Sequence, residues 1–460
     1  MKKYIIHILC ALSTFCVKAN KMPNIVLIYA DDQGWMDTGY QTKGQFQTPT
    51  LDKMARKGMT FTNAYTNAAN CQPARACLLS GNYTARHHVF AVNSTNRGPK
   101  EKMRLTPVPN RDGLAVKNIT IADALKGVGY TTGHFGKWHL YTKNGKGGSG
   151  ALPSQQGFDV TYDSFGDGEL PEGAKGNKPG PKSDPKGVFD LSKQACDFME
   201  VNKDKPFFVY LAHHAPHGPV NSRNSTREKI NNPYEACVYD LDESVNRVLA
   251  KIKDLGIEKE TLVLYTSDNG GCVKTQKPLR GEKGMYYEGG IRVPMIALWP
   301  GVIRPGTVCE EPVMQIDLFP TYLELAKAKI EKELDGESLL PLLKQNGKLE
   351  RESIYWHMPG YLDKSKSGAR DKNFRTRPVS VIRKGKWKLH LYHEEWLLDG
   401  GREKIDNNRA VELYNLDEDI SERNNLALNK KAIRDELLST LLAWHEELDA
   451  PMPLVKQKKK

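Results

Sequence analysis

Oxygen-rich side chains follow two short apolar runs of this sequence. The first run, residues 24–30, ends in Asp31 and Asp32, and the second ends in Asp268 and Asn269. A short, continuously apolar run is typical of a buried parallel strand, and ligands of α/β sheets bind at the carboxyl ends of such strands. Carboxylate and amide oxygens without nearby His or Cys ligands match a hard cation such as Ca²⁺ or Mg²⁺. The alternative is that the two aspartates cap a loop or a helix.

A thiol and a guanidinium stand close together in a third segment, at Cys71 and Arg75. Pro73 suits the first turn of a helix, so we expect Cys71 at a helix N-terminus, where the helix dipole and free N–H groups favour an anion. Arg75 lies four residues on and can reach the same anion. By this chemistry alone, Cys71 is either a nucleophile with a lowered pKa or a packed structural cysteine.

Two further apolar runs, residues 130–136 and 206–212, end in basic and imidazole side chains. These side chains are Lys137, His139, His213, His214 and His217. Residues two apart in an extended chain face the same side, so Lys137 and His139 are expected to face one site. For His213 and His214, a place in the substrate pocket and a structural role both stay open.

Helical patterns lie between the apolar runs. Residues 233–252 carry apolar side chains at spacings of three and four, and Gly256 follows as a stop signal. Shorter helices are expected at residues 51–57 and 121–126. Strands that alternate with helices predict an α/β fold, with a large doubly wound, mixed or mostly parallel sheet flanked by helices. Residues 293–299 are expected to add a buried strand.

The sequence changes character toward its C-terminal end. Residues 141–187 are rich in Gly, Pro, Lys and Ser, which predicts a long surface loop. After about residue 345, four short runs resemble strands of an antiparallel sheet, and a helix is expected at about 430–447. The expected division is a signal peptide at 1–19, a catalytic domain at 20–345 and a smaller C-terminal α+β domain at 346–460.

The two ends of the chain carry much of its excess positive charge. The 460 residues have a formal net charge of +12, and residues 1–19 and 451–460 together hold seven lysines and no acid. The remaining excess is mild, which excludes a nucleic-acid footprint. Two lysines, an apolar run to Val17 and a small residue at Ala19 predict a secretory signal, too short to span a bilayer permanently. We therefore expect an exported protein without a membrane span; a lipid anchor at Cys16 is the alternative.

The cysteines that follow this segment are widely spaced. No C-x-x-C pair occurs in the sequence, which argues against a zinc cluster or a thioredoxin-type motif. If Cys71 is chemically special, five cysteines are left after the signal peptide, so at least one of them cannot pair within the chain.

Together these motifs resemble the formylglycine-dependent sulfatases of the alkaline-phosphatase-like superfamily. The segment from Cys71 through Pro73 and Arg75, closed by Ser80 and Gly81, is similar to the signature in which the family's cysteine is oxidised to formylglycine. The resemblance covers most of the chain after residue 22. The other matching segments are residues 31–34, 136–139, 215–217, 267–270, 284–294 and 412–426. Two positions depart from the family pattern, namely Ala74, where Ser is common, and Ile420, where Pro is usual.

The resemblance implies a role for each matched residue. The metal ligands would be Asp31, Asp32, Asp268, Asn269 and the modified side chain of Cys71, and the ion is usually one calcium per chain. Arg75 and Lys137 would hold the formylglycine hydrate. His139 would be the base that breaks the hemiacetal, whereas His217 and Lys283 would bind the sulfate and assist the leaving oxygen.

The function implied is a sulfuric ester hydrolase that acts on sulfated oligo- or polysaccharides, of algal or host origin. It would require a formylglycine-generating maturation enzyme as a partner. The alternatives are a phosphomonoester or phosphonate hydrolase on the same scaffold, which would need additional His and Asp metal ligands, and an inactive carbohydrate-binding relative, which would lack a matched residue. The weak candidates for sugar contacts are His87, His88, Arg280, His357 and Arg375.

Overall fold

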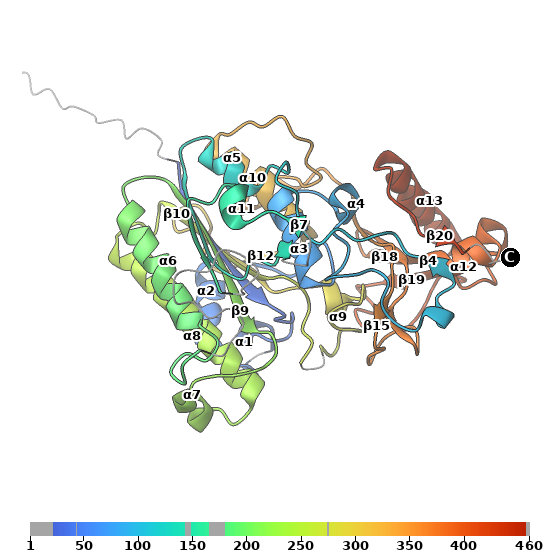
Figure 1. The fold of residues 1–460 in the computed structure, drawn as a ribbon, viewed down its shortest axis with the longest axis horizontal. Coiled ribbons are helices and arrows are strands. Elements are labelled where there is room, and N and C mark those ends of the chain that lie inside the picture. The colour runs from blue at the N-terminus through green and yellow to red at the C-terminus, as the bar shows by residue number, and fades with distance from the viewer. Residues whose placement is uncertain (1–21, 43, 143–148, 165–179, 274–275, 457–460) are drawn as a thin grey trace, which may run out of the picture.

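A computed structural model describes residues 22–42, 44–142, 149–164, 180–273 and 276–456, and its centre is an eight-stranded sheet (Figure 1). In spatial order the strands are β12 (Thr307–Cys309), β2 (Met59–Phe61), β11 (Met295–Leu298), β10 (Thr261–Ser267), β1 (Asn24–Asp31), β9 (Phe207–Pro216), β5 (Thr131–Gly136) and β8 (Val160–Asp163). Strands β10, β1, β9, β5 and β8 run parallel to one another, and β11 pairs antiparallel with both of its neighbours.

Strand β1 shows why the sheet needs helices on both of its faces. Ile25, Leu27 and Tyr29 pack into one apolar cluster, and Val26 and Ile28 pack into another on the opposite face. All of these side chains are fully buried. Successive strand residues point to opposite faces, so a continuously apolar strand is stable only when both faces are covered.

Helices provide that cover. One face carries α2 (Pro49–Lys57), α6 (Val188–Asn202) and α8 (Pro233–Asp254), and the other carries α3 (Cys71–Ser80), α5 (Ile121–Lys126) and α10 (Leu318–Ala326). Short helices α1 (Gly39–Thr42), α4 (Thr84–His87), α7 (Asn224–Lys229), α9 (Glu288–Ile291) and α11 (Leu340–Leu343) lie in the connections. The predicted α/β class is confirmed, as are the helices expected at 51–57, 121–126 and 233–252.

A second, antiparallel sheet lies beside the first. Its strands are β14 (Ser353–Met358), β17 (Val379–Lys384), β18 (Trp387–Tyr392) and β19 (Val411–Asn415), and α13 (Lys431–Glu447) packs against it (Figure 1). Further elements are helix α12 (His393–Leu398) and several two-stranded pairs. These pairs are β15–β16 (Leu362–Asp363 with Phe374–Thr376), β4–β20 (Leu105–Thr106 with Leu454–Val455), β3–β13 (Ala64–Tyr65 with Val313–Met314) and β6–β7 (Tyr141–Thr142 with Ser149–Gly150). The four strands and the helix predicted after residue 345 are present; the domain boundary at 345 itself stays a prediction.

A buried ionic cluster, formed by Lys388 of β18 with Glu288 and Glu422, connects the two sheets. The Lys388 Nζ lies 2.8 Å from Glu288 Oε1 and 2.9 Å from Glu422 Oε1. The second oxygen of Glu288 accepts from Tyr65 Oη at 2.7 Å and from Arg292 Nη1 at 3.2 Å, and the second oxygen of Glu422 accepts from the Glu288 backbone N–H. We call this set the Lys388 cluster; each of its carboxylate oxygens has a donor.

The expectation of a single long loop at 141–187 is wrong in part. Strand β8 forms an edge of the main sheet, pairing with β5. Its four residues include an exposed Val160 and show no alternation of buried and exposed side chains, so the sequence carries no strand signal there. The predicted signal peptide lies outside the described residues. Within the described residues, no helix is long and apolar enough to cross a bilayer.

Candidate active site

The two oxygen-rich pairs lie side by side because β1 and β10 are neighbouring parallel strands. Their register pairs Ala30 with Ser267, so Asp31 and Asp268 leave the sheet together. Asp32 turns back toward β10 with a left-handed φ of 63°, and its backbone N–H donates to Asp268 Oδ1 at 3.0 Å. Asn269 donates from Nδ2 to Asp32 Oδ1 at 2.7 Å. The predicted convergence of these four residues at a sheet edge is present, and all four are fully buried.

Cys71 is the first residue of α3, as the sequence predicts. Its side chain is 2% exposed, and every residue of the helix is buried. The helix ends at Gly81, which adopts the left-handed conformation that favours glycine at a helix C-cap. Lys283 Nζ donates to Cys71 Sγ at 3.3 Å and to Asp32 Oδ2 at 2.8 Å. The cysteine therefore faces the acidic pair across one lysine.

Three cations are each paired with one of the three aspartates. Arg75 Nη2 lies 2.8 Å from Asp268 Oδ2, Lys137 Nζ lies 2.8 Å from Asp31 Oδ2, and Lys283 Nζ lies 2.7 Å from Asp32 Oδ1. Arg75 also donates to the Lys137 backbone carbonyl at 2.9 Å. This set of three carboxylates and three cations is the Asp31 cluster.

Imidazole rings border the Asp31 cluster. His214 Nε2 lies 3.6 Å from Asp31 Oδ2, His217 Nε2 lies 3.6 Å from Asp32 Oδ2, and the two rings stack with centroids 5.0 Å apart. His139 is buried within range of the charges of Lys137 and Arg75. It has a left-handed φ of 63°, so the expected extended alternation of Lys137 and His139 is wrong, although both reach the cluster.

His213 and His214, whose roles the sequence left open, have different surroundings in the structure. His213 is fully buried, and its Nε2 lies 3.3 Å from Ser244 Oγ in α8, which is a structural contact. His214 is the one that borders the acidic pair. The sequence analysis missed Cys272, whose Sγ donates to Asp32 Oδ2 at 3.1 Å, and Tyr210, whose hydroxyl lies 3.4 Å from Arg75 Nη1. Neither residue stands in a matched motif, although Cys272 lies two residues after the segment 267–270.

Burial and mutual repulsion shift the pKa values of the acids. Burial would raise the pKa of Asp31, but Lys137, His217 and Arg75 together hold it well below its usual range. Burial and the charge of Asp31 raise the pKa of Asp268 to about 7. Burial also raises the pKa of the Cys71 thiol, only partly offset by Lys137 and Lys283, which argues against the thiolate nucleophile considered from the sequence. Burial, and then Lys137, lower the pKa of His139, so its imidazole is neutral at pH 7.

The oxygen donors fit a hard cation. Asp31 Oδ1 and Asn269 Oδ1 are buried and accept no hydrogen bond within the part of the chain that is described. Orphaned acceptors of this kind are costly unless a cation or water satisfies them. Asp31, Asp32 and Cys71 also offer ligand atoms that lie within 4.8 Å of one another. An oxygen-dominated set with three carboxylates favours Ca²⁺ or Mg²⁺ over softer metals.

Most of the residues considered for sugar contacts lie elsewhere. His87 is buried against Cys77, and Arg280 donates to Gly368, Tyr414 and Glu422. His88 is partly buried and stacks on a phenylalanine ring. Arg375 alone among the five contacts a residue of the Asp31 cluster, since its Nη1 donates to the Lys283 carbonyl at 3.3 Å.

The fifth candidate, His357, belongs to a buried histidine group. His357, His393 and His445 surround Ser380 Oγ at 2.8, 2.9 and 2.8 Å. His357 also has a carbonyl partner for its second ring nitrogen, at Pro451. The second nitrogens of His393 and His445 have no partner among the described residues, whereas a metal-binding histidine almost always donates from that atom. We interpret the group as a hydrogen-bonded core around Ser380.

Comparisons with known proteins show which family the chain belongs to. The sulfatase family model matches residues 23–328, and the model of the N-sulphoglucosamine sulphohydrolase C-terminal region matches residues 281–447. A sulfatase of Formosa agariphila is 31% identical, over 94% of this chain and 90% of its own. Human arylsulfatase A is 34% identical, over 91% of this chain and 86% of its own.

Solved structures share the fold. The crystal structure of Ps i-CgsB in complex with k-i-k-neocarrahexaose is 27% identical with a TM-score of 0.73, covering 95% of this chain and 96% of its own. The phosphonate monoester hydrolase of Agrobacterium radiobacter, at 18% identity and a TM-score of 0.66, has the same fold. The chain belongs to the sulfatase family of the alkaline-phosphatase-like superfamily. Within that superfamily its activity is that of a sulfuric ester hydrolase, which cleaves sulfate esters.

Proposed function

We propose that this sulfatase is exported, acts on sulfated carbohydrates, and uses Cys71 in its formylglycine form together with one calcium ion. The observation that supports the proposal best is the position of Cys71 Sγ, which lies 3.3 Å from Lys283 Nζ at the edge of the Asp31 cluster. The unmodified cysteine in the structure stands in for the formylglycine side chain.

The ion would be held by Asp31, Asp32, Asp268 and Asn269, with the modified Cys71 side chain as a further ligand. The orphaned oxygens of Asp31 and Asn269 support this ligand set. A hard divalent ion would supply positive charge at a sulfate oxygen.

Formylglycine, in its hydrated form, supplies a hydroxyl nucleophile and a second hydroxyl through which the product sulfate can be expelled. Arg75 and Lys137 would hold that hydrate. Both are fully buried and fixed by ion pairs, so their charges are already oriented before substrate binds. His139, neutral at pH 7, would accept the hydroxyl proton when sulfate leaves.

Lys283 and His217 would act on the leaving-group side. Cleavage of a sulfate ester builds negative charge on the leaving oxygen, which a nearby cation or proton donor stabilises. The Lys283 side chain is 12% exposed and that of His217 is 30% exposed, more than those of Arg75 or Lys137, so both can meet a substrate that arrives from solvent.

A sulfated oligo- or polysaccharide is the proposed substrate. The relative Ps i-CgsB has been solved with a neocarrahexaose, which supports a carbohydrate substrate for this chain as well. Export rests on the N-terminal sequence, and the formylglycine requires a maturation enzyme in the same cell. The domain division at 345 is proposed on the change from parallel to antiparallel sheet.

The main competing function is phosphomonoester or phosphonate hydrolysis, because such an enzyme shares the fold. A two-metal phosphatase needs further His and Asp ligands. Of the two histidines that could supply such ligands, His213 contacts Ser244, whereas His214 offers a ligand atom within 4.8 Å of those of Asp31 and His217. An inactive carbohydrate-binding relative would lack a nucleophile or a ligand, and all of the matched residues are present.

Two measurements on the exported protein test the proposal. Peptide mass analysis is expected to find formylglycine at position 71 in active enzyme. Turnover of paired aryl sulfate and aryl phosphate esters is expected to favour the sulfate by orders of magnitude. Full activity with an intact Cys71 thiol, or faster cleavage of the phosphate, would refute the proposal.

A further inference from the structure

Arg375 lies on strand β16, which contacts the loop that carries Lys283. We call that loop the Lys283 loop. Arg375 is the central residue of β16, between Phe374 and Thr376. Thr376 Oγ1 donates to the Gly284 carbonyl at 2.5 Å, and Arg375 Nη1 donates to the Lys283 carbonyl at 3.3 Å. The guanidinium of Arg375 therefore touches the backbone of the residue whose side chain reaches Cys71 and Asp32.

Gly284 provides the space that the arginine side chain occupies. Its φ is +87°, and a Cβ built on it would lie 2.5 Å from Arg375 Cδ. A side chain at position 284 would thus displace the aliphatic part of Arg375. Glycine here allows the arginine to cross the loop toward the candidate active site.

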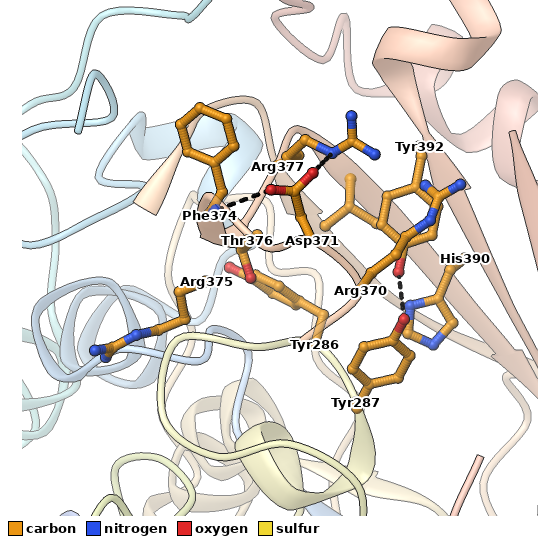
Figure 2. Close-up of a pocket in the computed structure, with 11 residues that line it drawn as sticks. Tyr286, Tyr287, Arg370, Asp371, Phe374, Arg375, Thr376, Arg377, His390 and Tyr392 are labelled. Atoms are coloured by element: carbon orange, nitrogen blue, oxygen red, sulfur yellow. Dashed lines mark hydrogen bonds and ion pairs between the residues drawn. The ribbon is translucent and has the colours of Figure 1, made fainter. Parts of the chain in front are cut away.

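Arg375 differs from its neighbouring arginines in its partners. Arg377 is paired with Glu394 and Glu395, and Arg370 is paired with Glu395 and Glu412. Arg375 makes no ion pair with any described residue, and its Nε is buried without a hydrogen-bond partner in that part of the chain. Figure 2 shows a pocket that Arg375 lines together with Tyr286, Tyr287 and Arg370, among others. The side chain of Arg375 extends away from the other residues drawn there.

Two acids interact with Arg375 over a longer range. Asp363 pairs with Arg97 at 2.7 Å, whereas Glu282 lies 3.9 Å from Lys366 and its Oε1 accepts no hydrogen bond among the described residues. A guanidinium presents N–H groups in a planar fork that matches sulfate and carboxylate oxygens. The Arg375 guanidinium makes no ion pair with a described residue, and it lies against the backbone of Lys283, whose side chain contacts Cys71.

We propose that Arg375 binds a second anionic group of the substrate, a sulfate or a carboxylate, on the sugar that carries the scissile ester or on the sugar next to it. This inference rests on the proposed carbohydrate substrate and names the feature by which that substrate is chosen. Arg375 is a specificity residue, because the reacting atoms are contacted by Lys283 and not by Arg375.

The test compares three disaccharides and one aryl sulfate. The disaccharides share one cleavable sulfate ester and differ at the second anion, which is absent, a sulfate or a uronate carboxylate; 4-methylumbelliferyl sulfate is the small reference. We expect Arg375→Gln to raise KM for one of the doubly charged disaccharides about 10- to 100-fold more than KM for the reference, as loss of a charged hydrogen bond predicts. The disaccharide that loses more identifies the anion.

Two control variants separate recognition from structure. Lys372→Gln removes an exposed charge from the same segment and is expected to change none of the four substrates. Arg375→Lys keeps the charge without the fork and is expected to recover part of the lost affinity. Added salt is expected to raise KM for the doubly charged substrate more in the wild type than in Arg375→Gln, because salt screens the ion pair.

Two results with Arg375→Gln would overturn the inference. Equal losses on all four substrates would mean that Arg375 only holds the Lys283 loop, and no loss on any substrate would mean that no second anion is bound there. Failure of the carbohydrate proposal looks different, because wild-type enzyme would then cleave the aryl sulfate and none of the disaccharides.

Discussion

The Asp31 cluster and the Lys388 cluster are both buried sets of acids and bases, and they differ in how fully their atoms are satisfied. In the Lys388 cluster, every carboxylate oxygen of Glu288 and Glu422 has a donor. In the Asp31 cluster, Asp31 Oδ1 and the neighbouring amide oxygen of Asn269 accept no hydrogen bond from the described residues. Buried polar groups are normally satisfied, so complete pairing indicates a structural role, whereas the two orphaned oxygens support the proposed cation site.

The two clusters also differ in which parts of the fold their residues come from. The Lys388 cluster joins β18 to the segment around α9, and its members lie far apart in sequence. The Asp31 cluster gathers Asp31, Asp32, Lys137 and Asp268 from the ends of strands of one sheet, together with Arg75 from α3 and Lys283 from a loop. The first therefore stabilises the contact between two parts of the fold, and the second is available for chemistry at the edge of one part. Buried charge alone therefore does not identify an active site.

The largest effect is expected for Cys71→Ala, which tests whether the Asp31 cluster belongs to a catalytic site. We expect sulfatase activity to fall by about 10⁵-fold or more, as for the loss of a catalytic nucleophile. The free energy of unfolding is expected to change by less than about 1 kcal/mol, since a small residue replaces a small residue. Aryl sulfate turnover and chemical denaturation measure the two quantities. A large loss of stability would assign Cys71 to the structural class.

His139→Ala and His217→Ala are expected to fail at different steps, each with a loss of about 10²–10⁴-fold. The His139 variant should release about one equivalent of alcohol per enzyme and then stop, because release of sulfate needs the base. The His217 variant should be slow from the start, most of all with sugar-like leaving groups. Rapid-mixing kinetics distinguish them; a burst from the His217 variant and none from the His139 variant would reverse the two roles.

Lys388→Met probes the structural cluster. It leaves the buried Glu422 without its lysine, and Glu288 ion-paired with Arg292 alone among the described residues. Breaking a buried ion pair typically costs about 3–5 kcal/mol of unfolding free energy. The kcat of the fraction that remains folded is expected to stay within a few-fold of wild type, because Lys388 contacts no residue of the Asp31 cluster. Denaturant titration and active-site counting separate the two effects. A collapse of kcat without loss of stability would contradict the assignment.

Chelation is expected to abolish turnover and to lower the free energy of unfolding by about 3 kcal/mol for an ion present at about 100 times its dissociation constant. Added Ca²⁺ or Mg²⁺ should restore both quantities. Asp31→Asn serves as the matched variant, in which the chelator should have little further effect on stability. Stoichiometric zinc in active enzyme, with no response to calcium, would contradict an oxygen-ligated hard cation.

The smallest expected effect is a pH dependence in the Lys388 cluster. Burial, and then the charge of Glu288, raise the pKa of Glu422 to about 7 although Lys388 opposes the shift. The folded state then binds a proton that the unfolded state releases near its ordinary pKa. Stability from this group is therefore present at pH 4.5 and is lost as pH rises through 7. Glu422→Gln should remove that slope; an unchanged difference between variant and wild type across this range would contradict it.

Much of the Asp31 cluster could be predicted because its members follow strands whose apolar runs are continuous. The run at 24–30 fixes where Asp31 emerges, and a parallel neighbour brings Asp268 beside it. The sequence did not indicate that His213 would face Ser244 while His214 faces Asp31, because alternation along one strand leaves the facing undecided.

The Lys388 cluster could not be predicted from the sequence. Lys388 and Glu288 are one hundred residues apart, and no local periodicity encodes a contact between a strand of one sheet and a short helix near the other. Strand β8 was missed for a related reason, since a short edge strand with an exposed side chain lacks the alternation that marks a strand. Local patterns give elements and their ends; contacts between distant elements depend on the packing of the whole chain.

The complete burial of α3 has a consequence for the order of events in the life of the protein. The proposed maturation enzyme would have to bind the segment around Cys71, yet every residue from Cys71 to Ser80 is buried once the chain is folded. The proposed oxidation would therefore take place on the extended chain, in the interval between synthesis and folding. The active fraction of a preparation would then depend on the rate of oxidation relative to the rate of folding. A variant that folds faster would be more stable and yet contain fewer oxidised, active molecules.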